Sequence, residues 1–227
     1  MKYTKSGIKL GNEEFFSTKA EYENIKYETG TIKLNNKEYL STKAYGEEQA
    51  PEPPTKEAGL YVNGVLSKSW EQLIADGDVT ITNGTLRVAN TSLAGELVCD
   101  NVEGLTNLIA TFYNCQSLIN IDASKLNTSN VRDMRNMFYG CSSLTGLDLS
   151  SFDTSKAAIM GSMFEGCSSL TNLDISNFTF DKVINYDFMF IDVPKNCEIL
   201  VKSQTEKDWI TSRFTSLTDV KIKESNT

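Results

Sequence analysis

A seven-residue pattern recurs in this chain at a fixed spacing. It reads FYNCQSL at residues 112–118, FYGCSSL at 138–144 and FEGCSSL at 164–170, so each step is 26 residues, and a degenerate fourth copy begins at Met189. A period of this size is typical of stacked-repeat proteins, in which a single unit cannot bury its own apolar face. The chain is therefore expected to form a solenoid, and the functional question becomes what its surface binds.

Each repeat contains a short alternation of apolar and polar residues. The apolar positions that share one register are Leu118, Ile121, Ala123, Leu144, Leu147, Leu149, Leu170, Leu173, Ile175, Ile199 and Val201. Such alternation is typical of a strand with one buried face. The sequence predicts parallel, adjacent strands near residues 119–123, 145–149, 171–175 and 198–202.

A different spacing precedes each strand. Apolar residues at 131, 134, 137 and 138, and again at 157, 160, 163 and 164, are three residues apart or adjacent. This spacing predicts a helix of one to two turns on the side opposite the strands. Thr128 and Thr154 are expected as N-caps, and Asn114, Gly140 and Gly166 as left-handed stop residues. The expected fold class is an α/β solenoid.

The repeat resembles a leucine-rich-repeat-like family of bacterial surface proteins, whose units read MFxGCSSLTxLDLS. The matching residues are 134–150 and 160–176, with a weaker match at 108–124. Residues 59–73, through Asn63-Gly64 and Ser69-Trp70, look like the lead-in to such repeats in phage and prophage structural proteins. The resemblance implies a parallel sheet on one face of the solenoid and short helices on the other.

A second duplication occupies the start of the chain. Residues 8–20 and 32–44 agree at nine of 13 positions, and each copy reads as a hairpin centred on Gly-Asn or Asn-Asn. Two such hairpins are too small to be stable alone. We therefore expect residues 1–44 to be an attachment arm that buries its apolar side chains elsewhere. The predicted attachment residues are Ile8, Leu10, Phe15, Phe16, Ile32, Leu34, Tyr39 and Leu40.

The remaining segments frame the repeats. Residues 45–58 hold three of the four prolines and are expected to be a linker. Residues 59–104 are expected to cap the solenoid with two Asn-Gly hairpins, a short helix at 69–77 and a first strand at 93–99. The repeats themselves occupy residues 105–202. Residues 203–227 form the other cap, with a helix at 205–214 and a last strand at 219–223.

Composition excludes several classes of function. The net charge of −8 and the pI near 4.7 argue against nucleic acid or anionic membrane as a partner, because both need a basic field. Histidine is absent, which removes the commonest general base and metal ligand. No cluster supplies an alternative base for a nucleophile. We expect no enzymatic activity and no cofactor.

Three of the five cysteines share the repeat spacing: Cys115, Cys141 and Cys167. Five cysteines are an odd number, and three of them follow the repeat, so they do not form a disulfide framework. A metal site or a redox relay would be an alternative, but no second type of ligand accompanies the column. Cysteine is commonly a small buried residue, so we expect the three thiols to be buried and reduced.

Aspartates recur on the outer face of the predicted strands, at Asp122, Asp148 and Asp174. Like charges on adjacent strands repel each other, so solvent or neighbouring hydroxyls, a cation, or a ligand should offset them. These three interpretations stay open at this point. The candidate ligand-binding residues on this face are Asn120, Asp122, Ser124, Asp148, Ser150, Asn172, Asp174 and Ser176.

The first residues, MKYTKSGIKL, contain no apolar signal region, and no stretch is apolar enough to span a membrane. We therefore expect no export signal and no membrane insertion. The favoured function is a phage virion protein (a head fibre or decoration protein, less likely a tail component), attached by its arm to capsid or tail proteins and binding a host-surface protein or glycan. A bacterial cell-surface adhesin is the alternative, and an intracellular scaffold is a third. Homo-oligomers are expected, because a duplicated arm suits a symmetric particle.

Overall fold

The computed structural model describes the strands within residues 2–45 and all of residues 56–224. The chain divides into two compact units, residues 1–55 and residues 56–227, and each is considered by itself. The first unit is a set of antiparallel pairs. β1 (Lys2–Leu10) pairs with β2 (Glu13–Glu21), β3 (Lys26–Thr29) with β6 (Thr42–Tyr45), and β4 (Lys33–Leu34) with β5 (Glu38–Tyr39).

The predicted attachment arm can be compared with the structure only at the level of its backbone. The β1–β2 and β4–β5 pairs lie where the two duplicated hairpins are expected. Ile32, Leu40 and most of the predicted linker lie outside the described residues, as do the side chains of Ile8, Leu10, Phe15, Phe16, Leu34 and Tyr39. The proposed burial of these residues stays a prediction.

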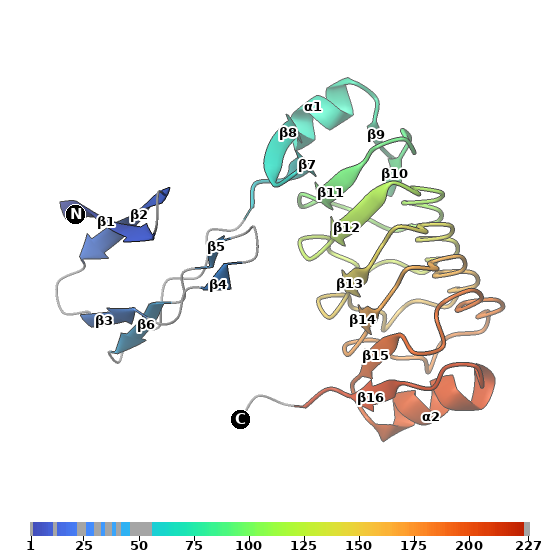
Figure 1. The fold of residues 1–227 in the computed structure, drawn as a ribbon. Helices are drawn as coiled ribbons and strands as arrows, with labels where there is room; N and C mark the ends of the chain where they lie inside the picture. Colours follow the sequence, from blue (N-terminus) through green and yellow to red (C-terminus); the bar gives the residue numbers. More distant parts are fainter. Residues whose placement is uncertain are drawn as a thin grey trace. The chain divides into compact units, whose positions relative to one another are not determined.

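The second unit is a β-solenoid of about five turns, here called coils. Its parallel strands are β11 (Gly95–Val98), β12 (Leu118–Asp122), β13 (Gly146–Asp148), β14 (Asn172–Asp174) and β15 (Glu198–Val201). Leu147 pairs with Leu173, and Leu173 pairs with Ile199, as the shared register predicts. The four predicted repeat strands are present, with their ends shifted by at most one residue (Figure 1), and the predicted parallel pairing holds for β13, β14 and β15 but not between β12 and β13.

The strands do not form one continuous sheet. One sheet has the order β12-β11-β7-β8, where β7 (Gly59–Val62) runs antiparallel to β11 and β8 (Val65–Ser69) antiparallel to β7. The other has the order β13-β14-β15-β16, where β16 (Val220–Ile222) is parallel to β15. The ladder is therefore interrupted between β12 and β13, in the middle of the repeats.

The side of each coil opposite the strands, called here the turn side, contains no helix within residues 105–202, so the predicted repeat helices are wrong. Backbone N–H groups at 134, 136, 138 and 140 donate to carbonyls of the next coil, whereas those at 137, 139 and 141 donate three residues back. An α-helix would send every one of these groups four residues back. A spacing of three is shared by helices and by successive turns, and here the bonds between coils select the turns.

Left-handed backbone geometry also excludes a helix on the turn side. Asn136 and Ser162 have φ of 56° and 53°, in the middle of the two segments predicted to be helical. The expected stop residues do adopt this geometry: φ is 57° at Asn114, 69° at Gly140 and 77° at Gly166. They end a turn instead of a helix. Glycine and asparagine suit both roles, because they tolerate positive φ.

The two predicted N-cap threonines join successive coils instead. The hydroxyl of Thr128 donates to the Asp153 carbonyl (3.1 Å) and accepts from the Asp153 N–H (2.8 Å). Thr154 makes the same pair of bonds with Thr179, at 3.2 and 2.9 Å. Both threonines are buried. Each hydroxyl therefore satisfies one donor and one acceptor that would otherwise be buried without a partner.

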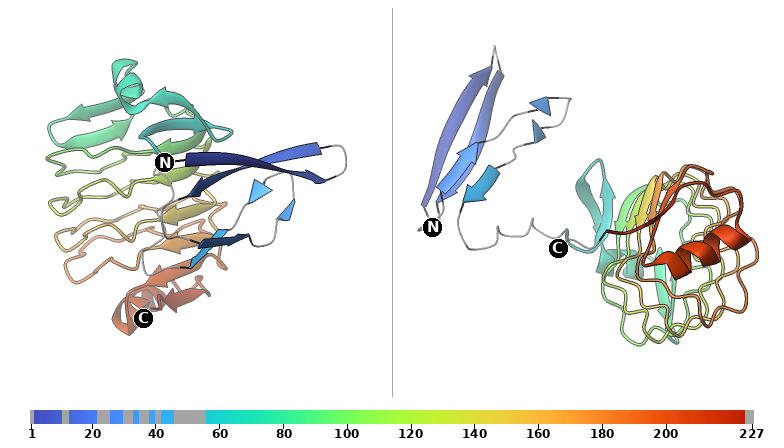
Figure 2. Two further views of the ribbon diagram at one scale, coloured as in Figure 1. Left: turned by 90° about the vertical axis from the view of Figure 1, so that its left-hand side faces the viewer. Right: turned by 90° about the horizontal axis from the view of Figure 1, so that it is seen from below.

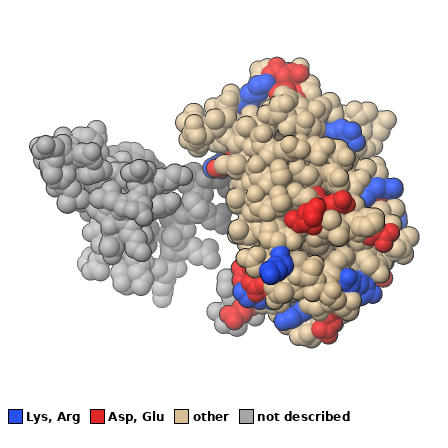
Figure 3. All heavy atoms as spheres, turned by 45° about the vertical axis from the view of Figure 1, so that its right-hand side comes forward, with Lys and Arg blue, Asp and Glu red and all other residues tan. Residues whose placement is uncertain are grey.

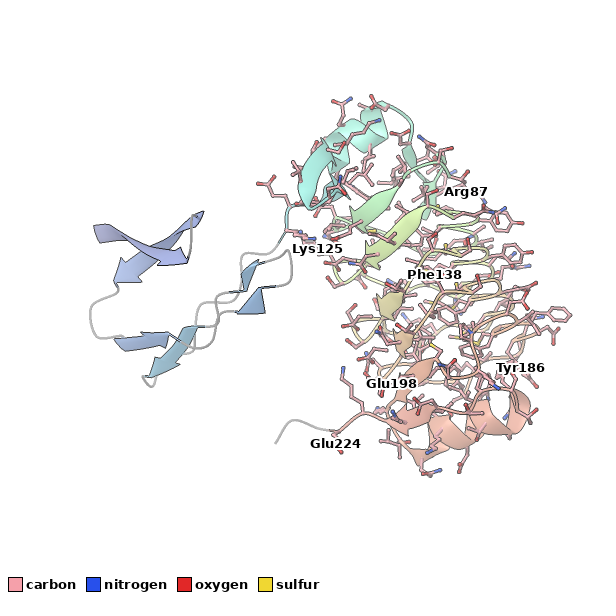
Figure 4. The ribbon with its side chains drawn as sticks, viewed as in Figure 1. Arg87, Lys125, Phe138, Tyr186, Glu198 and Glu224 are labelled. Atoms are coloured by element: carbon pink, nitrogen blue, oxygen red, sulfur yellow. The ribbon has the colours of Figure 1, made fainter. Side chains whose placement is uncertain are left out.

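Columns of identical side chains fill the interior. The rings of Phe112, Phe138, Phe164 and Phe190 stack with centroid separations of 5.2, 5.8 and 5.5 Å. Phe138 has no exposed surface and lies inside the stack (Figure 4). Because every coil supplies the same side chain at the same place, the core is continuous along the solenoid.

The cysteine column belongs to this interior, and its expected burial is confirmed. The Cys141 thiol donates to the Phe112 carbonyl at 3.0 Å, and the Cys167 thiol to the Phe138 carbonyl at 3.2 Å. Burial raises the pKa of Cys115 and of Cys167 to about 12. A thiol is a nucleophile or metal ligand only as thiolate, so this column is structural.

A short helix lies at each end of the solenoid, with hairpins at the first end and the parallel strand β16 at the second. At one end lie α1 (Trp70–Ala75), whose N-cap Ser69 accepts from the Gln72 N–H, and the hairpin of β9 (Val79–Thr82) and β10 (Thr85–Val88). At the other end α2 (Gln204–Arg213) lies across the last coil (Figure 2). Its Trp209 stacks on Phe180 at 4.2 Å. These caps keep the terminal coils from exposing the core.

Candidate functional site

The outer face of the strands carries the predicted site residues. Asp122, Asp148 and Asp174 each end a strand and accept, through Oδ1, the backbone N–H two residues later, at 3.0, 2.9 and 2.9 Å. Ser124, Ser150 and Ser176 supply these N–H groups. Such Asx turns fix the carboxylate and leave its second oxygen for another partner. For one oxygen of each aspartate, a backbone N–H group of the same loop therefore offsets the charge.

The third aspartate differs from the other two. Lys223, which follows β16, reaches across the sheet, and its ammonium donates to Asp174 Oδ2 at 2.6 Å. Partial burial favours the neutral acid, but the hydrogen bonds from Lys223 and Ser176 outweigh it and hold the pKa of Asp174 below its usual value. Within residues 56–224 neither Asp122 nor Asp148 has such an ion pair.

A cleft opens on the sheet side at the interruption between β12 and β13. It encloses a cavity of about 350 Å³, lined by Asn120, Ile121, Asp122, Ser124, Asp148, Ser150 and Ser151. At the neighbouring junctions the Leu149 N–H donates to the Asp174 carbonyl and the Ile175 N–H to the Leu200 carbonyl. In the described part of the chain no such bond joins Ala123 to Asp148. The cleft thus lies where this hydrogen bond between the coils is absent.

The cleft is nevertheless held by a rigid frame. On the turn side the same two coils are joined by bonds from Phe112 N–H to the Met137 carbonyl (2.8 Å) and from Asn114 N–H to the Tyr139 carbonyl (2.7 Å). At the corner after the strands, Thr128 holds Asp153. Because the coils are fastened on both sides of the gap, the cleft is formed before any ligand arrives, which lowers the entropic cost of binding.

The polar groups of the cleft are mainly hydrogen-bond acceptors. Asp122 and Asp148 add two negative charges, Asn120 adds an amide, and three serines add hydroxyls that donate or accept. The floor includes the buried Ile121. Among the described residues no three His, Cys, Asp or Glu side chains are placed to hold a metal ion. This arrangement suits a ligand that presents several hydroxyl or amine donors beside an apolar face.

The structure brings together five of the eight predicted ligand-binding residues: Asn120, Asp122, Ser124, Asp148 and Ser150. Asn172, Asp174 and Ser176 lie on the same face but outside the cleft. Ser151 and Ile121 also line the cleft but were not among the predicted ligand-binding residues. Beside the gap, Gly146 stands where the neighbouring repeats carry Asn120 and Asn172, and Ala123 stands where the later repeats carry Leu149 and Ile175.

A second cluster of charges lies in the cap before the repeats, and its hydrogen bonds give it a structural role. The Lys68 ammonium donates to Asp76 at 2.7 Å and to Asp78 at 2.6 Å, and Asp78 also accepts from the Asn90 amide at 2.7 Å. The hydrogen bond from Lys68 is the main reason that the pKa of Asp78 lies below its usual value. The cluster ties β8, α1 and the loop after β10 together.

No helix in the described part of the chain is long and apolar enough to cross a membrane. The model of a family described as "Mycoplasma protein of unknown function, DUF285" matches residues 87–219, which is more than half of the chain and includes every repeat. Searches of curated proteins and of solved structures found no match.

Proposed function

We propose that this chain, which belongs to the DUF285 family, is a non-enzymatic recognition protein that binds a surface glycan in the cleft between β12 and β13. The observation that carries the proposal is the coincidence of the interrupted ladder with two aspartates that have no ion pair in residues 56–224. Sugar hydroxyls donate to carboxylates, and the apolar face of a sugar ring packs on an aliphatic floor.

The first experiment replaces both cleft aspartates, Asp122→Asn and Asp148→Asn. The amide oxygen still accepts the N–H of Ser124 or Ser150, so the Asx turns and the fold should remain. Hydrogen bonds to charged groups contribute about 1.5–3 kcal/mol each, so each lost carboxylate should weaken binding about tenfold or more. Binding is measured on a glycan array and on host cells.

The matched control for this variant is Asp174→Asn. It removes an aspartate of the same column, at the same position in the repeat, but outside the cleft. It should bind like the unaltered protein, although it loses the ion pair with Lys223. The proposal is wrong if the double variant binds normally, or if Asp174→Asn loses as much affinity as the double variant.

We further propose that residues 1–44 attach the protein to a phage particle, as a head fibre or decoration protein and less likely as a tail component. Two observations support this: the antiparallel pairs of residues 2–45 form a unit of their own, and their sequence is duplicated. A second candidate is a bacterial cell-surface adhesin. The family description favours it, because it refers to a protein of a cellular organism.

Deletion of residues 1–44 tests the attachment. The truncated protein should keep the thermal unfolding of the solenoid, because the caps and repeats lie within residues 56–224. It should be absent from purified particles that incorporate the full chain, as judged by mass spectrometry of the virions. Incorporation of the truncated chain at normal occupancy would place attachment in the solenoid. Detection of the full chain on intact bacterial cells that carry no phage would favour the adhesin.

A further inference from the structure

Three large apolar side chains are exposed within eight residues of the last coil. Ile184 is 80% exposed, Phe188 64% and Ile191 47%, and together they are called the apolar patch. The repeat does not require them. The two preceding coils carry Arg132 and Ala158, Asn136 and Ser162, and Tyr139 and Glu165 at the equivalent positions. Exposed apolar groups that gather in one place mark sites of interaction with other molecules.

Phe188 is placed in a backbone conformation that a bulky residue rarely adopts. Its φ is 61°, in the left-handed region. The equivalent residues of the earlier coils have the same geometry, with φ of 54° at Ala110, 56° at Asn136 and 53° at Ser162. A small or polar residue therefore suits this position better. Phenylalanine adds conformational strain there without gaining burial, so the stability of the fold does not account for it.

Carboxylates surround the apolar patch. Asp187 precedes Phe188, and Asp192 follows Ile191; both are exposed. Glu165 lies one coil away beside Ile191, because the Gly166 N–H donates to the Ile191 carbonyl at 2.9 Å. On the basic side, Lys182 is exposed two residues before Ile184, and the Arg213 guanidinium lies over the rings of Tyr186 and Trp209.

The surroundings of the patch favour a basic partner. Figure 3 shows that charged groups on the turn side are scattered among uncharged surface. A second copy of the chain is disfavoured, because it would bring the three carboxylates toward those of the copy, with only Lys182 and the stacked Arg213 of each chain to offset them, on a protein with a net charge of −8. A segment that combines apolar side chains with lysine or arginine matches both the patch and its rim.

We propose that the apolar patch is a docking site for a partner protein that presents apolar side chains flanked by lysine or arginine. The site lies on the turn side of the last coil, the coil to which Tyr186 in Figure 4 belongs, whereas the cleft lies on the sheet side between β12 and β13. It is independent of the glycan proposal. Phe188 is the anchor, since a large exposed aromatic held in a fixed backbone loses little entropy on binding.

The probe is a short synthetic peptide of leucine and lysine with a fluorescent label, and binding to the full chain is followed by anisotropy. Two matched peptides replace lysine by glutamate or leucine by serine. The protein variants are Phe188→Asn, which introduces the residue found at Asn136, and Tyr139→Ser, which removes an aromatic side chain two coils away. The double variant of Asp122 and Asp148 is measured in parallel.

The leucine–lysine peptide should bind, and the two matched peptides should bind at least about tenfold more weakly. Phe188→Asn should reduce affinity for the leucine–lysine peptide about tenfold or more and leave the melting temperature unchanged or higher, because asparagine accepts the left-handed geometry. The Tyr139 and cleft variants should bind the peptide normally. Equal binding by Phe188→Asn, equal binding of the glutamate peptide, or a Phe188-dependent dimer in sedimentation would overturn the proposal.

Discussion

Phe138→Ala should lower the free energy of unfolding by about 3–5 kcal/mol, the usual cost of deleting a fully buried phenyl ring. Phe138 has no exposed surface, and its ring lies between those of Phe112 and Phe164 at 5.2 and 5.8 Å. The alanine leaves a gap in the middle of the stack, and both neighbouring rings lose a contact. Chemical denaturation followed by circular dichroism measures the change.

The control for Phe138→Ala is the residue next to it. Tyr139 stacks on Tyr113 at 4.8 Å but is half-buried at the surface. Tyr139→Ala should therefore cost about 1 kcal/mol or less. If the two alanine variants lose similar amounts, the phenylalanine column is not the main source of cohesion between coils.

The second large effect concerns the bonds between the corners of the coils. Thr154→Val keeps the shape of the side chain but removes the hydroxyl that serves both the N–H and the carbonyl of Thr179. A buried group left without a partner costs about 1–3 kcal/mol, and because the two groups of Thr179 are only partly buried, the variant should lose about 2–3 kcal/mol, near the lower end for two such groups. The same denaturation experiment measures it, and hydrogen exchange should show the Thr179 amide losing protection.

Thr171→Val is the matched control for Thr154→Val. Its hydroxyl also donates to the preceding coil, at 2.7 Å to the Thr145 carbonyl, but the residue is exposed and water can replace it. The loss there should stay within about 0.5 kcal/mol. A loss at Thr154 no greater than this would show that the buried hydroxyl is dispensable.

The strands of the solenoid could be predicted because the same apolar pattern recurs in each repeat. Ile121, Leu147 and Leu173 hold the same register in three successive repeats. One arrangement buries all three, and the structure pairs Leu147 with Leu173. The turn side could not be predicted in the same way. Met134 and Met137 are spaced as on a helix. The backbone N–H groups of Met134 and Phe138, however, donate to carbonyls of the next coil. That choice depends on the neighbouring coil, which a local pattern does not contain.

Most residues of the candidate site could be predicted from the sequence, but the position of the cleft could not. The outward direction of Asp122, Asp148 and Asp174 follows from strand alternation. The difference in environment between Asp174 and the other two aspartates does not follow from it. This difference arises from Lys223, 49 residues beyond Asp174, and from the interruption between β12 and β13. Both depend on how distant parts of the chain meet. Phe188 could not be predicted from the pattern that the repeats share, because it is a departure from that pattern.

The contacts between coils have a consequence for how such a chain changes in evolution. The coils at residues 131–156 and 157–182 are joined to their neighbours by equivalent bonds, from Phe138 to Met163 and from Phe164 to Met189. Unequal recombination between the corresponding stretches of DNA would add or remove one whole coil while the helical caps stay in place. The molecule would lengthen or shorten by about 4.8 Å, the spacing of adjacent strands. Selection can therefore change the length of the solenoid in equal steps of one coil, while the packing of the core stays the same.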